Sequence, residues 1–147
     1  IEHIGSTSIK GLAAKPIIDI DIVYTHVASF KEIKTSLEHL GYYHNGDQGI
    51  KGREVFKRKK NKKPNVVLDT IHHHLYVCHS SSEELKRHLV FRDFLRKNSI
   101  ERKAYENLKK EIAEKTNHNR KQYAKLKEIM AKEFIESIIT KAKKTEF

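Results

Sequence analysis

The sequence predicts an α+β fold in which helices pack on a small sheet and a helical segment ends the chain. Three observations support this prediction. A segment near the N-terminus alternates like a strand, the next segment has the apolar spacing of a helix, and the pattern is helical from Ser80 onward. With 147 residues and no internal repeat, a single domain over residues 1–147 is expected.

The first strand is predicted over residues 16–24, which read PIIDIDIVY. The segment is rich in β-branched residues and alternates strictly. Side chains two residues apart on a strand point to the same side. The isoleucines at 18, 20 and 22 therefore share one face, and Asp19 and Asp21 share the other.

A helix is expected to follow, from Ser29 to Leu40. Ser29 and Glu32 match a capping box, and Gly41 supplies the stop. The next segment, 42–52, predicts a loop that can approach a ligand closely. Its turns are marked by glycines at 46, 49 and 52.

The chain then predicts a β-hairpin with a charged tip. Its two strands are expected at Arg53–Arg58 and Val66–Cys78. The tip carries lysines at 59, 60, 62 and 63 and ends at Pro64. A lysine-rich tip prevents edge-to-edge pairing of sheets, so a solvated end is favoured over a nucleic-acid contact.

Three helices are expected after the hairpin. Ser81 with Glu84 forms a capping box for the first, Ser99 caps the second, and Asn117 or Asn119 starts the third. Apolar residues recur at helical spacing in all three: Leu85, Leu89, Phe91 and Leu95, then Tyr105, Leu108 and Ile112, then Tyr123, Leu126, Met130, Phe134 and Ile138.

The composition favours an anionic partner. Thirty Lys and Arg against nineteen Asp and Glu give a formal charge of +11, which attracts nucleotides and other phosphorylated small molecules. Nucleic acid is a less favoured partner, because no helix-turn-helix, zinc-finger or aromatic RNA-binding signature is present. The lone Cys78 and the lack of a membrane-length apolar run lead us to expect a cytoplasmic protein without a membrane partner.

Asp19 and Asp21 form the candidate metal site and are also the candidate catalytic residues. Their carboxylates converge on one face, and two acids held this close repel unless a cation lies between them. Mg²⁺, or Mn²⁺ in its place, suits them because it takes one or two carboxylates together with substrate phosphates. Such ions activate an attacking oxygen and stabilise leaving pyrophosphate. The alternative is that both acids face solvent at a sheet edge.

Five further residues are candidates for substrate binding. Gly5 lets the backbone approach a phosphate, and Ser6 offers a hydroxyl and a backbone N–H. Lys15 adds a positive charge just before the strand, and the guanidinium of Arg53 suits phosphate or carboxylate. His74 is expected to border the two acids as a hydrogen-bonding group or supplementary ligand.

Other residues support weaker hypotheses. His72, His74 and Cys78 share a strand face, which suggests zinc, yet they do not make a closed tetrahedral site. Arg87 and Arg92 suit a phosphate or carboxylate of the substrate, and Arg92 equally suits a neighbouring acid. Cys78 is not expected to be a nucleophile, because no base and orienting group are arranged around it.

The segment IGSTSIKGLAAKPIIDIDIV, from Ile4 to Val23, resembles the signature of the GrpB family, which is placed in the nucleotidyltransferase superfamily. Further matches cover nearly the whole chain: GIKGREVF at 49–56, HHLYV at 73–77, RHLVFRDFLR at 87–96 and YENLKKEIA from 105. The resemblance implies a nucleotidyltransferase-like mixed sheet with appended helices. It also implies metal-ligand roles for Asp19 and Asp21 and phosphate-side roles for Gly5 and Ser6.

The resemblance adds two expectations. Family members usually have a helical segment ahead of the Gly-Ser turn, so the N-terminus of this sequence, which begins at Ile1, is expected to be incomplete. The third acid of active superfamily members has no obvious counterpart, and His79 stands where relatives often carry an acidic residue.

Two functions are therefore expected. The first is a metal-dependent nucleotidyltransferase that transfers a nucleoside monophosphate from a triphosphate to an acceptor. The alternative is a non-catalytic module on the same fold, which binds a nucleotide, a coenzyme A precursor or another acidic small molecule.

Overall fold

The computed structural model describes residues 1–61 and 63–145, and these group into two compact units. The first unit comprises Ile1–Ser8 and Ala14–Leu89. The second comprises Ile9–Ala13 and the chain from Val90 onward. The expectation of a single domain stays a prediction.

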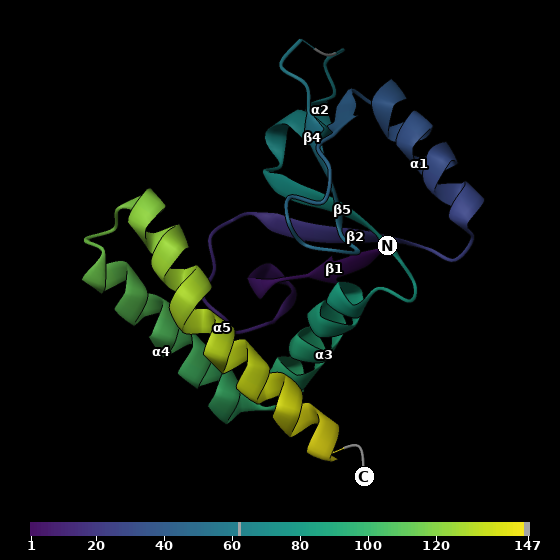
Figure 1. The fold of residues 1–147 in the computed structure, drawn as a ribbon. Coiled ribbons are helices and arrows are strands. Elements are labelled where there is room, and N and C mark those ends of the chain that lie inside the picture. Colours follow the sequence, from purple (N-terminus) through teal and green to yellow (C-terminus); the bar gives the residue numbers. More distant parts are fainter. Residues whose placement is uncertain (62, 146–147) are drawn as a thin grey trace. The chain divides into compact units, whose positions relative to one another are not determined.

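The first unit is built around a mixed five-stranded sheet with the strand order β1-β2-β5-β4-β3 (Figure 1). β2 and β5 are parallel, and the other neighbouring pairs are antiparallel. This sheet, together with the helices, confirms the α+β prediction. The strands are β1 at Glu2–Ile4, β2 at Ile18–Tyr24, β3 at Tyr42–His44, β4 at Glu54–Arg58 and β5 at His73–His79.

β2 confirms the strand that alternation predicts. Its isoleucine face lies on the apolar core, while the fully buried residue of the strand is Asp21 on the other face. Ile20 and Ile22 pack against a core whose buried members are Leu37, Tyr42, Phe56, Leu75 and Val77. The helix α1, at Val27–His39, contributes Leu37 to this core and lies beside the sheet (Figure 1). Asp19 and Asp21 consequently lie on the sheet face opposite α1.

The predicted start of α1 is wrong. The helix begins at Val27, and the residue in the cap position is His26, which makes no side-chain cap bond. Ser29 lies inside the first turn, where its N–H donates to His26 O at 2.9 Å, so it does not cap the helix. The predicted stop is confirmed, because Gly41 has φ +93° and its N–H donates to Glu38 O.

The predicted hairpin is correct in its pairing and wrong in its connection. β4 and β5 are antiparallel, with Phe56 opposite Leu75. The segment Val66–Thr70, predicted as strand, forms the helix α2. Its cap explains the difference, since Asn65 Oδ1 accepts the N–H of Leu68 at 3.0 Å.

Two short strands were missed by the sequence prediction. β3, predicted as loop, pairs with β4, and β1 pairs with β2. Each is only three residues long, too short for alternation to be read. Of the predicted tip lysines, those at 59, 60 and 63 are exposed, and Lys62 lies outside the described residues.

The chain continues into α3 at Glu83–Lys97, α4 at Ser99–Lys115 and α5 at Arg120–Thr145. The predicted caps need two corrections. Ser82, rather than Ser81, caps α3, because its Oγ accepts the N–H of Leu85 at 3.2 Å. Ser99 is the first residue of α4 and does not cap it. Asn119 Oδ1 accepts the N–H of Gln122, which confirms one of the two predicted starts of α5.

The second unit is helical, with α4 and α5 side by side (Figure 1). Leu95, Tyr105 and Ile138 are buried in its core, joined by Ile9 and Leu12 from the segment after Ser8. None of the helices within the described ranges is both long and apolar enough to cross a membrane.

Candidate functional site

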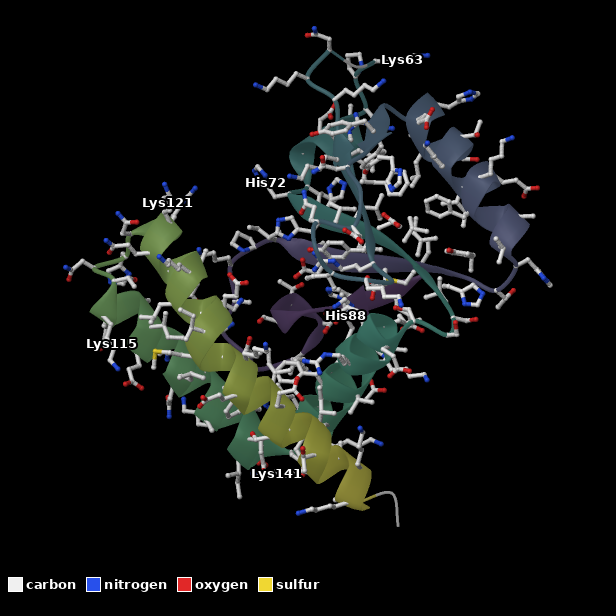
Figure 2. The ribbon with its side chains drawn as sticks, viewed as in Figure 1. Lys63, His72, His88, Lys115, Lys121 and Lys141 are labelled. Carbon is white, nitrogen blue, oxygen red and sulfur yellow. The ribbon has the colours of Figure 1, made fainter. Side chains whose placement is uncertain are left out.

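The carboxylate of Asp21 is completely buried, with 0 % of its surface exposed. Its Oδ2 lies 2.7 Å from Nδ1 of His88, which projects from the first half of α3 (Figure 2). Its Oδ1 is also buried and has no hydrogen-bond partner among the residues that the structure describes. A buried carboxylate oxygen without a donor is costly, and it is the kind of atom that a cation or a ligand group satisfies.

His88 links two acids. Its Nδ1 contacts Asp21, and its Nε2 lies 3.2 Å from Oε1 of Glu84, one turn earlier on α3. Burial acts to lower the pKa of His88, but the hydrogen bonds to Asp21 and Glu84 and their negative charges outweigh it and raise this pKa to about 9. The same hydrogen bond to His88 lowers the pKa of Glu84. His88 is therefore an imidazolium at neutral pH and donates from both nitrogens.

Asp19 is more accessible than Asp21, with 26 % of its side chain exposed. It lies directly beside His74 in the parallel pairing of β2 with β5. The Nδ1 atom of His74 lies 2.8 Å from Asp19 Oδ1, so the structure brings together these two predicted site residues. His74 is itself 57 % exposed, which leaves this edge of the site open to a ligand.

Gly5 lies against Asp19. It follows β1, whose last residue, Ile4, is paired with Asp19, and it has φ +72°. A Cβ atom at Gly5 would collide with Asp19 Oδ2 and lie 3.1 Å from its Cγ. Only glycine combines this backbone conformation with this approach. Ser6 opens the short 3₁₀ helix Ser6–Ser8 immediately after Gly5, and Lys15 is exposed ahead of β2.

Arg53 comes just before β4 and contacts Tyr76 of β5, the strand that lies between β4 and β2. Its guanidinium is 4.6 Å from the centroid of the Tyr76 ring, and Tyr76 is paired with Asp21 across β2 and β5. The Nε atom of Arg53 is buried and, in the described part of the chain, has no hydrogen-bond partner. Burial, and next the charge of Asp19, raise the pKa of Tyr76 to about 12, so its hydroxyl stays protonated.

The donor set fits magnesium better than zinc. Two carboxylates, one of which has a buried oxygen without a donor among the described residues, suit an ion that completes its shell with water and phosphate. No group of three His, Cys, Asp or Glu side chains near enough to share an ion occurs in residues 1–61 and 63–145, so the zinc hypothesis gains no support. Burial raises the pKa of Cys78 to about 12, which keeps it a thiol.

The remaining predicted residues lie elsewhere or pair locally. Arg87 Nε is 3.6 Å from Glu84 Oε2. Arg92 Nε is 2.8 Å from Asp93 Oδ1, so of the two partners expected for Arg92, a phosphate or a neighbouring acid, the structure shows the neighbouring acid. His79 is paired with Tyr24 on the isoleucine face and bonds to the carbonyl oxygen of Thr25, so it does not reach Asp19 or Asp21.

Sequence reasoning missed His88. The spacing of Glu84 and His88, four residues apart on a predicted helix, was the one available signal, since such pairs interact on a helix surface. That spacing does not reveal that His88 also reaches Asp21, which is 67 residues away in the chain.

The chain is similar to a family of known sequences over nearly its full length. The model of the family described as GrpB protein matches residues 1–141. The Glutamate-rich protein GrpB of Alkalihalophilus pseudofirmus is 36% identical over 143 residues, which are 95% of this chain and 76% of that protein. The UPF0157 protein YqkA of Bacillus subtilis is 37% identical over 113 residues, which are 77% of this chain. The chain spans only 31% of YqkA.

The fold is similar to a solved structure. The crystal structure of the conserved protein GrpB from Enterococcus faecalis matches with a TM-score of 0.71 and 30% sequence identity. The match covers 95% of this chain and 79% of that one. The similarity therefore includes both compact units.

Proposed function

The chain belongs to the GrpB family, and from this membership and the geometry of its two aspartates we propose that it is a metal-dependent nucleotidyltransferase. Asp19 and Asp21 bind a divalent cation, Mg²⁺ or Mn²⁺, together with the phosphates of a nucleoside triphosphate. An oxygen of the acceptor attacks the α-phosphorus, a phosphoanhydride bond breaks, and pyrophosphate leaves.

The observation that carries this proposal is the unpartnered Oδ1 of the buried Asp21. His88 compensates only the other oxygen of that carboxylate. A buried acceptor left without a donor costs about 1–3 kcal/mol, and more when it is charged. A bound cation removes this cost, and Asp19, the neighbouring acid on the same face of β2, serves as its second carboxylate ligand.

The other residues of the site hold the substrate. Gly5 keeps the backbone close to Asp19, whose carboxylate takes the space that a side chain at position 5 would fill. Ser6 supplies a hydroxyl and an N–H beside it, and Arg53 supplies a buried Nε–H that needs an acceptor. Lys15 adds a positive charge ahead of β2, and His74 orients Asp19 through its hydrogen bond. When bound, the cation would neutralise phosphate charge and so favour attack at phosphorus.

A second candidate is a binding module without turnover. It is favoured by a specific observation: within the described ranges, no three His, Cys, Asp or Glu side chains are placed to hold one metal ion together. The ligand would then be a nucleotide or another acidic small molecule held by the same residues.

Nucleotide binding with and without magnesium tests the proposal. Calorimetric titration with ATP and GTP is expected to show binding that requires Mg²⁺, and Asp19→Asn is expected to weaken it at least about tenfold, the loss of one charge-assisted contact. Asp47→Asn is the matched control. Asp47 accepts the N–H of Gly49 in an exposed turn, and asparagine keeps that bond while losing the same charge. Magnesium-dependent affinity that is equal in wild type and Asp19→Asn would refute the metal site.

Turnover separates the two candidates. Pyrophosphate release, followed by ³¹P NMR with a panel of hydroxyl, carboxylate and phosphate acceptors, is expected for the transferase. Saturable binding with no product from any nucleotide or acceptor would favour the binding module.

A further inference from the structure

A cavity of about 560 Å³ lies in the first unit, at the end of the sheet where β5 begins and β4 ends. Cavities of this size hold small molecules. Its lining includes His74 and Tyr76 of β5, with Val55 and Lys57 of β4. Because His74 also bonds to Asp19, the cavity and the proposed cation site share a wall.

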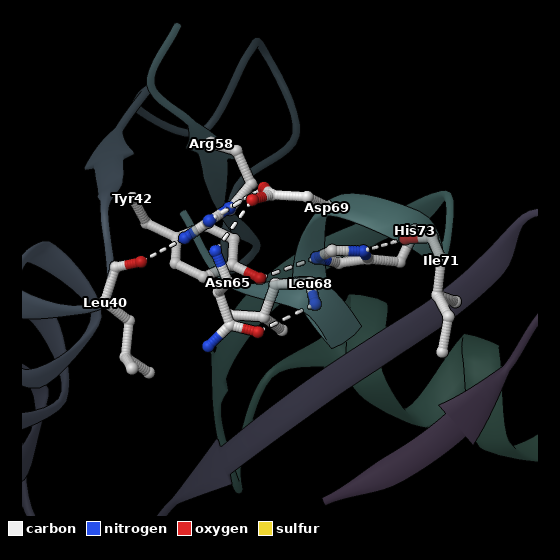
Figure 3. A network of polar contacts seen from close by, with 8 residues as sticks. All are labelled: Leu40, Tyr42, Arg58, Asn65, Leu68, Asp69, Ile71 and His73. Carbon is white, nitrogen blue, oxygen red and sulfur yellow. Dashed lines mark hydrogen bonds and ion pairs between the residues drawn. The ribbon is translucent and has the colours of Figure 1, made fainter. Parts of the chain in front are cut away.

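The charged groups of the cavity leave a positive balance. Arg58 and Asp69, which both line it, satisfy each other at 2.8 Å, and Asp69 also accepts the N–H of Asn65 (Figure 3). Lys57 also lines the cavity, and among the described residues its ammonium makes no hydrogen bond or ion pair. The uncompensated charge in the lining is therefore a cation.

The same network holds the cavity in shape. Tyr42 Oη lies 2.6 Å from His73 Nε2, and His73 Nδ1 donates to the carbonyl oxygen of Ile71 at 2.7 Å (Figure 3). Arg58 also donates to the carbonyl oxygen of Leu40. These bonds fix one side of the lining before a ligand binds, so less ordering is required on binding.

Part of the cavity lining is apolar. Val55, Phe56, Leu68 and Leu75 contribute apolar surface to it. His72, two residues before His74, lines the cavity and, within the described ranges, has a ring that makes no hydrogen bond. A ligand that fits this lining has an anionic group near Lys57 and His72 and an apolar or planar body.

We infer that this cavity binds a small molecule that carries a phosphate or carboxylate group on a partly apolar body, with Lys57 and His72 holding the anion. Its position next to Asp19 assigns this molecule as the acceptor of the transferred nucleotidyl group. That role rests on the proposed function, whereas the binding of the anion does not.

NMR titration of the chain without magnesium tests the inference, with inorganic phosphate in one arm and citrate in the other. The imidazole signals of His72 and His74 are expected to shift at millimolar concentration in at least one arm, and the responding arm identifies the anion. Lys57→Gln is expected to raise the dissociation constant about tenfold, as is usual for loss of a charge-assisted hydrogen bond. Lys31→Gln is the matched control, since it removes the same charge from an exposed position on α1.

Three results would overturn the inference: neither arm shifts these signals, Lys57→Gln binds as the wild type does, or Lys31→Gln weakens binding equally. Its failure can be told apart from failure of the proposed function. If nucleotide affinity requires magnesium and Asp19, but anion affinity is the same in the wild type and in Lys57→Gln, only the cavity assignment fails. If anion affinity depends on Lys57 while no nucleotide binds with magnesium, only the transferase proposal fails.

Discussion

The Nδ1 atom of His88 lies 2.7 Å from Oδ2 of the completely buried Asp21. The other ring nitrogen reaches Glu84, so one imidazolium is shared between two carboxylates. This arrangement compensates the charge of Asp21 inside the fold while leaving its Oδ1 available. His88 is therefore the residue that allows an acid to be buried at the proposed cation site.

Replacing His88 is expected to destabilise the first unit strongly. The variant His88→Leu fills a similar volume but leaves Asp21 buried without its partner, and breaking a buried ion pair in this way costs about 3–5 kcal/mol. Urea unfolding at neutral pH measures the change. The control is Lys86→Leu on the same helix, whose exposed pair with Glu83 is worth less than about 1 kcal/mol. Adding Asp21→Asn to His88→Leu is expected to restore part of the loss, and no recovery would contradict the explanation.

The same pair predicts how stability depends on pH. The folded pKa of His88, about 9, lies above the ordinary histidine value of 6.5, so its contribution is fully present below pH 6.5 and is lost as the pH rises through 9. The loss is about 3 kcal/mol in the free energy of unfolding. Tyr76 and Cys78, with pKa values of about 12, do not titrate in this window. Urea unfolding between pH 6 and pH 10 measures this loss of stability. The prediction is contradicted if the free energy of unfolding changes with pH in the wild type just as it does in His88→Leu.

Much of the fold follows from local pattern, and the errors have local causes. Strict alternation predicts β2 correctly, because its apolar and acidic side chains point to opposite faces and Ile20 and Ile22 pack on the core. Val66–Thr70 begins with β-branched residues and was predicted as strand, yet it is helical. There the side chains of Asn65 and Asp69 accept backbone N–H groups of the first turn, and these contacts outweigh the weak strand propensity.

The arrangement of the candidate site was predictable where its parts lie close in sequence. Asp19 and Asp21 share a face by alternation alone, and the Gly5 turn lies a short segment ahead of them. His88 and Tyr76 reach the acids only through tertiary contacts, from α3 and from the parallel pairing of β5. Single-sequence patterns carry no information on which helix covers which face of a sheet.

The corrected cap of α3 leads to a third prediction. Ser82 Oγ accepts the N–H of Leu85 and donates to the carbonyl oxygen of Gly52 at 2.9 Å, so it joins α3 to the turn before β4. Ser82→Ala is expected to lower the free energy of unfolding by about 1–2 kcal/mol, the usual cost of losing an N-cap. Ser81→Ala, which among the described residues loses just the hydroxyl contact with His79 Nδ1, is the control and should cost less than about 0.5 kcal/mol. Equal losses in denaturant unfolding would mean that Ser82 does not cap the helix.

The last prediction separates the backbone conformation of Gly5 from its contact with Asp19. Gly5 and Gly46 have nearly the same φ, +72° and +71°, but a Cβ at Gly46 would meet nothing within 4 Å. Alanine at either position therefore carries the same left-handed strain, about 1–2 kcal/mol. At Gly5 the new methyl group would also collide with the carboxylate of Asp19, which adds about 1–3 kcal/mol of overpacking.

Gly5→Ala is accordingly expected to unfold at a lower urea concentration than Gly46→Ala. It is also expected to lose magnesium-dependent nucleotide affinity, because displacing Asp19 moves a proposed ligand, while Gly46→Ala retains it. Thermal and urea unfolding check the first expectation, and calorimetric titration checks the second. If both variants lose the same stability and bind nucleotide equally, the approach of Gly5 to Asp19 has no role in the site.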